Sequence, residues 1–143
     1  KDVVNVILTR DPKEMIPSFV KVIENPTIND IGYADHTELQ NYFEENNIPY
    51  IVLDSKLLLQ NPKGVLQQFC ELIGVNFDEN MLKWEKGPRK EDGIWAKYWY
   101  DNIHDSKGFM EYKPKTESFT DRYKSLLDSC KTHYNQLVKK ALR

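Results

Sequence analysis

The N-terminal stretch limits the possible folds most strongly, because an apolar run ends abruptly on a charged turn. Residues 3–9 read VVNVILT, a composition typical of a buried strand. Arg10-Asp11-Pro12 follows at once, and Asp and Pro are favoured as the N-cap and first residue of a helix. We therefore predict a strand that leads directly into a helix. In an open α/β sheet, ligands bind at the carboxyl ends of such strands.

The spacing of hydrophobic residues after this first strand predicts a strand–helix–strand unit. The helix that begins at Asp11 is expected to end at residues 25–26, although Pro17 conflicts with a helix interior. A loop is predicted at residues 27–34 and a second helix at residues 37–45. Residues 50–53 (YIVL) are apolar throughout, which is typical of a strand in a buried parallel sheet.

The second half of the chain is predicted to be rich in helix. Asn61-Pro62 resembles a helix start, and Gly74 is a suitable end for the same helix. Asp78 is expected to cap a short helix that reaches Trp84. The clearest helical period runs over residues 123–142. Two loops and an aromatic stretch lie between these helices, at residues 85–93, 108–114 and 95–103.

Composition argues against several classes of function. The chain has 143 residues, enough for one domain with a core, and 20 Lys and Arg against 22 Asp and Glu give a net charge of −2. No basic stripe is present, so we expect no nucleic-acid partner. No apolar run approaches the length of a membrane span and no signal peptide is visible. We therefore expect a cytoplasmic protein without a membrane partner.

The cysteines and histidines predict structural roles. Cys70 and Cys130 each lie in an apolar helical pattern and are expected to be reduced core thiols, with a disulfide between them as the alternative. The histidines and cysteines lack the spacing of a metal site, so no metal is expected. His104-Asp105-Ser106 contains the residue types of a catalytic triad, but neighbours in sequence rarely form one.

Two groups of residues are candidates for binding phosphate. Arg10, at a strand end and beside a helix start, forms with Ser18 a candidate anion clamp. The alternative is a surface arginine and an ordinary helix serine. Arg89 and Lys90 lie between glycines in a loop that ends at Gly93, where the backbone can approach a phosphate closely. The alternative is a solvated loop whose own carboxylates neutralise these charges. The aromatic residues that follow could stack on a planar ligand or form core.

Together these motifs resemble the P-loop sulfotransferase family. The stretch at residues 8–14 with Ser18 is similar to the motif whose Arg and Ser bind the 3′-phosphate of 3′-phosphoadenosine 5′-phosphosulfate. Residues 54–74 are similar to the family's strand, Asn-Pro turn and following helix. Residues 87–95 are similar to the C-terminal loop that closes over the nucleotide. The resemblance covers nearly the whole chain.

The resemblance implies a fold, an activity and a set of binding residues. The fold would be α/β, a partial P-loop NTPase-like parallel sheet with flanking helices and a helix-rich C-terminal half. Residues 1–143 would form the C-terminal part of a single sulfotransferase-like domain. The intact protein would transfer a sulfonyl group from 3′-phosphoadenosine 5′-phosphosulfate, its co-substrate, to a small-molecule hydroxyl or amine. Arg10 and Ser18 would bind the 3′-phosphate, while Arg89, Lys90 and Gly93 would close over it.

Residues 1–9 contain neither the family's P-loop nor its catalytic base. We therefore expect this chain, which begins at Lys1 without Met, to be a piece of a larger protein and to be inactive by itself. Apolar edges and faces of the two strands would then be exposed, and would be covered by a second copy of the chain or by the missing N-terminal half. An inactive nucleotide- or protein-binding module of the same fold is the main alternative. A third alternative is a different nucleotide-dependent transferase.

Overall fold

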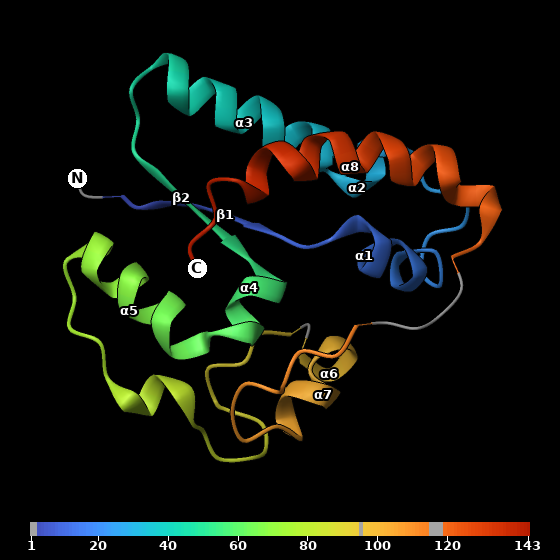
Figure 1. The fold of residues 1–143 in the computed structure, drawn as a ribbon. Helices are drawn as coiled ribbons and strands as arrows, with labels where there is room; N and C mark the ends of the chain where they lie inside the picture. Colours follow the sequence, from blue (N-terminus) through green and yellow to red (C-terminus); the bar gives the residue numbers. More distant parts are fainter. Residues whose placement is uncertain (1–2, 95, 115–118) are drawn as a thin grey trace.

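Two parallel strands form the centre of the fold, as the apolar runs predict (Figure 1). The computed structural model describes residues 3–94, 96–114 and 119–143. β1 (Asn5–Thr9) pairs with β2 (Tyr50–Asp54), in a register that ends with Thr9 opposite Asp54. The expected α/β class is therefore confirmed as a mixed fold with a small two-stranded parallel sheet. Because the strands are parallel, their carboxyl ends lie side by side.

The first helix begins where the sequence predicts and ends early. α1 (Pro12–Phe19) is capped by Asp11, whose side chain accepts a hydrogen bond from the Lys13 backbone N–H at 2.8 Å. The expected continuation to residues 25–26 is wrong. Pro17 lies inside this helix and has no N–H to donate to the preceding turn, and the regular helix ends two residues later.

The loop expected around Gly32 contains helix instead. α2 (Ile28–Ile31) precedes the glycine, and α3 (Tyr33–Glu45) begins directly after it, earlier than the sequence predicts. The Thr27 backbone N–H and hydroxyl both donate to the Asp30 carboxylate, at 2.7 and 2.6 Å. This local capping stabilises a helix that is too short to produce a visible hydrophobic period.

The segment after β2 confirms the Asn-Pro helix start. α5 (Pro62–Ile73) is capped by Asn61, which accepts a hydrogen bond from a backbone N–H, and it ends at Gly74 with a φ of 72°. A further short helix, α4 (Ser55–Gln60), lies between β2 and α5 and was not expected. The short helix expected after Asp78 is the 3₁₀ turn η1 (Glu79–Leu82).

The last helix is confirmed but is shorter than its hydrophobic period indicates. α8 (Lys124–Val138) ends before Ala141, which forms a parallel bridge with Val52, and the Leu142 N–H donates to the Val52 carbonyl at 3.1 Å. The unpaired edge of β2 offers hydrogen bonds that a further helical turn would not supply. Three shorter helical segments lie in the region before it: α6 (Ala96–Trp99), α7 (Asp101–His104) and η2 (Asp121–Tyr123).

The core lies between the strands and the two long helices α3 and α8. Figure 1 shows these helices on one side of the strands, with α5, α6 and α7 on the other. One cluster joins both strands to α3 and α8 and contains Ile7, Phe43, Val52, Leu137 and Ala141. A second joins α1, α3 and α8 and contains Ile16, Tyr33, Leu127, Cys130 and Tyr134. Both cysteines are buried free thiols, as predicted.

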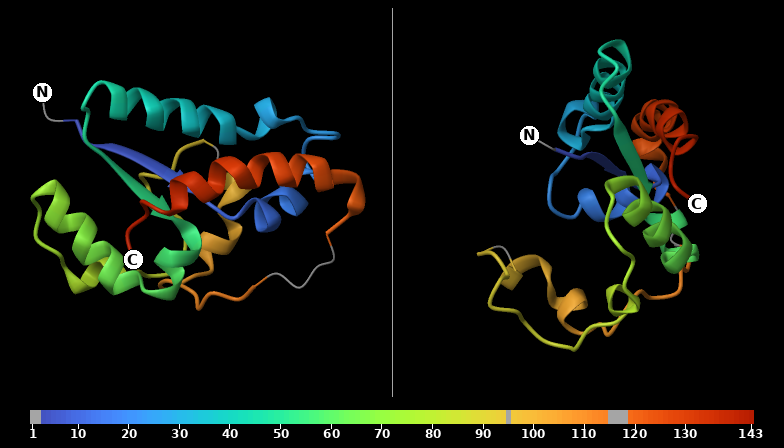
Figure 2. Two further views of the ribbon diagram at one scale, coloured as in Figure 1. Left: turned by 45° about the horizontal axis from the view of Figure 1, so that its top comes forward. Right: turned by 90° about the vertical axis from the view of Figure 1, so that its left-hand side faces the viewer.

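The face of β1 that carries Val4, Val6 and Leu8 is apolar and open to solvent. Val4, Val6 and Leu8 are 49%, 41% and 61% exposed, which confirms the expectation that the strands present uncovered apolar surface. In the right-hand view of Figure 2, the segment that carries α6 and α7 projects away from the strands. Among the described residues, no helix has both the length and the apolar character needed to cross a membrane.

Candidate functional site

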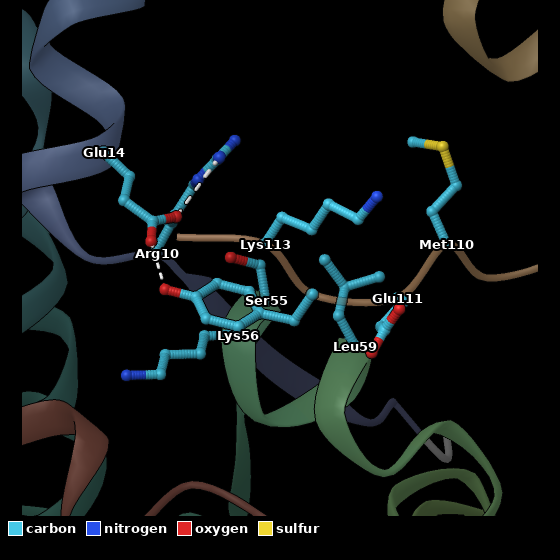
Figure 3. A pocket seen from close by; sticks show the side chains of 9 residues that line it. Arg10, Glu14, Ser55, Lys56, Leu59, Met110, Glu111 and Lys113 are labelled. Atoms are coloured by element: carbon cyan, nitrogen blue, oxygen red, sulfur yellow. Dashed lines mark hydrogen bonds and ion pairs between the residues drawn. The ribbon is translucent and has the colours of Figure 1, made fainter. Parts of the chain in front are cut away.

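A cavity of about 580 Å³ lies where the two strands end (Figure 3). We call it the strand-end cavity. It is lined by the turn after β1, by the start of α4 after β2, and by the segment at residues 110–113. Its position agrees with the general rule for ligand sites in parallel α/β sheets. Its charged and aromatic lining includes Arg10, Glu14, Lys56, Tyr112 and Lys113.

Arg10 is held at the cavity by its backbone and by its side chain. Its carbonyl oxygen accepts a hydrogen bond from the Tyr33 hydroxyl at 2.5 Å, and burial raises the pKa of Tyr33, so that hydroxyl keeps its proton. Arg10 Nη2 lies 3.4 Å from Glu14 Oε2. The Arg10 side chain is still 45% exposed, so part of the guanidinium is accessible to a ligand. A guanidinium in this position is suited to bind phosphate or sulfate.

Glu14 links Arg10 to the segment on the opposite side of the cavity. Its buried carboxylate accepts a hydrogen bond from the Tyr112 hydroxyl, which is 98 positions away in the sequence. This hydrogen bond, and secondly desolvation, raises the pKa of Tyr112 to about 12. The phenol therefore remains a donor at neutral pH. Figure 3 shows the Arg10–Glu14 ion pair as a dashed line.

Two lysines increase the positive charge of the cavity. Lys56 Nζ lies 5.3 Å from the centre of the Tyr112 ring, within cation–π range, and Lys113 is exposed at the rim. With Arg10 they make three cations against the carboxylates of Glu14 and Glu111, which favours an anionic ligand.

Neither lysine was a candidate from the sequence. Lys56 could have been found, because it follows β2 closely, as Arg10 follows β1. Lys113 lies in a loop whose local sequence does not indicate a binding site.

Ser18 lies on α1 one turn beyond Glu14 and is exposed. Residues four apart share one face of a helix, so Ser18 lies on the face that also carries Glu14. It is not among the described residues that line the strand-end cavity. The structure thus places Arg10 at the cavity and Ser18 farther along the helix. The clamp that combines them stays a prediction.

The loop at residues 85–93 is structured by its own contacts. The Arg89 guanidinium donates to the Glu85 carbonyl oxygen at 2.8 Å, and Lys90 forms an exposed ion pair with Glu91 at 3.5 Å. Gly93 is exposed. None of Arg89, Lys90 and Gly93 is among the described residues that line the cavity. Their role in nucleotide binding stays a prediction.

The run His104-Asp105-Ser106 does not form a triad. His104 Nε2 lies 2.8 Å from Asp92 Oδ2, and Ser106 Oγ donates to the Ile103 carbonyl oxygen at 2.6 Å. In the predicted aromatic stretch, Tyr100 contacts the His104 ring edge-on, with ring centres 5.9 Å apart. Trp95 and the side chains at positions 98 and 99 lie outside the described residues, so the stacking prediction is untested there.

These features define a class of protein: an α/β fold with a cavity at the carboxyl ends of parallel strands, whose lining carries more cations than carboxylates. A comparison with protein families places the chain within that class. Residues 1–141 match the sulfotransferase domain family, and the chain belongs to that family. The resemblance drawn from the sequence motifs is therefore confirmed over nearly the whole chain.

Two plant proteins are similar to this chain. Branched-chain-amino-acid aminotransferase-like protein 2 of Arabidopsis thaliana is 32% identical over 131 residues, and the corresponding protein 1 is 33% identical over 131 residues. Each match covers 92% of this chain and 23% of the relative. The chain thus spans about a quarter of the length of the curated relatives it matches. No solved structure matches it.

Proposed function

We propose that the intact protein is a sulfotransferase that uses 3′-phosphoadenosine 5′-phosphosulfate as co-substrate. The observation that carries this proposal is the position of Arg10, whose side chain lines the strand-end cavity directly after β1 in a chain of the sulfotransferase domain family. In this proposal, residues 1–143 are the C-terminal part of a single P-loop-type domain. The two buried free thiols are typical of a reducing compartment, which supports a cytoplasmic location.

The proposed roles of the residues are in binding. Arg10 binds the 3′-phosphate of the nucleotide, and Ser18 on the same stretch adds a hydroxyl donor. Arg89, Lys90 and the backbone N–H of Gly93 close over that phosphate. The positive charge of the strand-end cavity supports an anionic ligand of this kind.

The proposed reaction moves a sulfonyl group between two oxygen atoms, or from oxygen to nitrogen. The bond between sulfur and the bridging oxygen of the 5′-phosphate breaks, while a bond forms between sulfur and the acceptor hydroxyl or amine. A base outside residues 1–143 takes the acceptor proton, and the nucleotide leaves as the 3′,5′-bisphosphate. Cationic groups lower the barrier by stabilising charge on the sulfonyl oxygens and the leaving phosphate.

A nucleotide- or protein-binding module without catalysis is the second candidate. The observation that favours it is the printed name of the two plant relatives, which are called aminotransferase-like proteins and are not named for sulfonyl transfer. Nucleotide binding without sulfonyl transfer by the intact protein would support this candidate. Transfer to any hydroxyl or amine acceptor would support the enzyme.

Calorimetric titration with 3′-phosphoadenosine 5′-phosphate tests the binding site, with 5′-AMP as the nucleotide that lacks the 3′-phosphate. We expect the 3′-phosphorylated nucleotide to bind more tightly. Arg10→Ala should weaken its binding about tenfold or more, because a charge-assisted contact to phosphate is lost. The mutant should bind 5′-AMP as well as the wild type does.

Arg122→Ala is the matched control, since Arg122 lies against the Tyr123 ring and does not line the strand-end cavity. It should leave both affinities unchanged. Equal affinity of wild type and Arg10→Ala for the 3′-phosphorylated nucleotide would remove Arg10 from the site. Equal affinity of the wild type for the two nucleotides would show that the protein does not recognise the 3′-phosphate.

A further inference from the structure

We propose that His104 is a positioning residue that holds the loop at residues 85–93 in the conformation required for nucleotide binding. This inference rests on the proposed function, in which Arg89, Lys90 and Gly93 of that loop close over the 3′-phosphate. His104 itself lies outside the loop, at the end of α7. No part of the proposed chemistry uses its side chain.

His104 contacts the loop at two separate points. Its Nε2 lies 2.8 Å from Asp92 Oδ2, and its backbone carbonyl oxygen accepts a hydrogen bond from the Gly87 N–H at 2.8 Å. The side chains of His104 and Asp92 are 23% and 20% exposed, so their contact is partly shielded from water. One residue therefore fixes both the start and the end of the loop.

Asp92 transmits this contact to the residues proposed to bind phosphate. Its Oδ2 also accepts a hydrogen bond from the Arg89 backbone N–H at 2.8 Å. That bond, and secondly the bond with His104, lowers the pKa of Asp92, so the carboxylate is charged at neutral pH. The Asp92 carboxylate thus joins the backbone that precedes Lys90 to the His104 ring.

The base of the loop is held independently of His104. The Trp84 indole N–H donates to Ser106 Oγ at 2.8 Å, and its backbone N–H donates to the Lys107 carbonyl at 3.3 Å. Next to this pair, Lys83 and Gly108 form an antiparallel bridge. Loss of the His104 side chain should therefore loosen the loop between residues 86 and 93 while its base stays in place.

Three variants of the full chain separate the side-chain contact from general effects. His104→Phe keeps a ring beside Tyr100 but has no donor for Asp92. His104→Gln retains an N–H donor near the position of Nε2 and should rescue the loop. Asp105→Asn is the matched control. It removes an exposed ion pair between Lys86 and Asp105, which lie 3.9 Å apart and join the loop to the end of α7, as His104 does.

Two measurements are made on each variant. Hydrogen exchange, followed by mass spectrometry on a peptide that covers residues 86–93, reports the order of the loop. Calorimetry gives the affinities for 3′-phosphoadenosine 5′-phosphate and for 5′-AMP. In His104→Phe we expect faster exchange and a five- to tenfold loss of preference for the 3′-phosphorylated nucleotide, about the effect of one lost hydrogen bond. His104→Gln and Asp105→Asn should retain wild-type values.

The outcomes distinguish this inference from the proposed function. If the wild type prefers the 3′-phosphorylated nucleotide and His104→Phe keeps the same preference, the positioning role is wrong while the proposed function stands. If the wild type binds neither nucleotide, as residues 1–143 and as the intact protein, the proposed function fails and the positioning role fails with it. Faster exchange in His104→Phe would then identify only a contact that stabilises the loop. A general loss of affinity for both nucleotides would also contradict positioning at the 3′-phosphate.

Discussion

At the scale of single residues, Asp54 combines two structural roles at the end of β2. The residue is 1% exposed. Its Oδ1 accepts a hydrogen bond from the Leu57 N–H at 2.9 Å and caps α4, while its Oδ2 accepts one from the Tyr134 hydroxyl at 3.0 Å. Burial, and secondly the charge of Asp54, raises the pKa of Tyr134, so the hydroxyl remains a donor. Asp54 thereby connects β2 to α8 beside the strand-end cavity.

Tyr134→Phe should destabilise the protein by about 1–3 kcal/mol, because the buried Asp54 carboxylate loses one donor without gaining water. Urea unfolding at neutral pH measures the free energy of unfolding. Tyr42→Phe is the control, since Tyr42 is 55% exposed. It should change the free energy by less than about 0.5 kcal/mol. Equal stability of Tyr134→Phe and the wild type would show that the buried bond contributes nothing.

At the scale of elements, Glu44 joins α3 to β2 and to the chain after α8. Its carboxylate accepts hydrogen bonds from the Tyr50 hydroxyl at 2.6 Å, from Gln40 Nε2 at 3.1 Å, and from Lys140 Nζ. The bond from Lys140, and secondly that from Tyr50, lowers the pKa of Glu44 to about 2 from its ordinary value of 4.5. One charged carboxylate thus connects α3, β2 and the chain after α8.

This contact should make stability depend on pH in a defined window. The pKa is lower in the folded than in the unfolded state, so the stabilisation is fully present above about pH 4.5 and is lost as the pH falls toward about 2. Unfolding in urea at pH 6 and pH 3 measures the loss. Glu44→Gln should lose less stability than the wild type between these values. Identical pH dependence would show that Glu44 carries no such linkage.

At the scale of the whole molecule, the uncovered face of β1 is the main departure from an ordinary α/β protein. Parallel sheets normally have both faces covered, and a pair of strands rarely provides a stable sheet by itself. Here the helices α3 and α8 cover one face, while Val6 and Leu8 on the other are 41% and 61% exposed. We propose that a second copy of the chain or the missing N-terminal half covers this face.

Residues 1–143 by themselves should therefore self-associate through β1. Leu8→Lys should lower the average mass measured by sedimentation, because it places a charge on the exposed face without disturbing the buried Ile7 side. Val22→Lys is the control: Val22 is 64% exposed but lies outside the strands. A wild-type chain that sediments as a monomer at high concentration would contradict this prediction.

Comparison of particular residues shows which sequence signals were reliable. The caps Asp11 and Asn61 marked helix starts correctly, because a cap acts within three residues of itself. The hydrophobic period predicted a helix up to residue 142. This prediction was wrong at its end, because Ala141 pairs with β2 instead of continuing the helix. The short α2 was missed, because its capping residues Thr27 and Asp30 act without a hydrophobic period.

The sequence by itself determined the α/β class, the two strands, the family and the position of Arg10 after a strand. The strands and the position of Arg10 follow from periodicity and capping within a few residues, while the family follows from the resemblance of short motifs. Only the tertiary structure decided that Glu14 contacts Tyr112, that Lys56 and Lys113 line the same cavity as Arg10, and that His104 contacts Asp92. Such contacts join positions up to 98 residues apart. They depend on how the whole chain packs, and no local pattern contains that information.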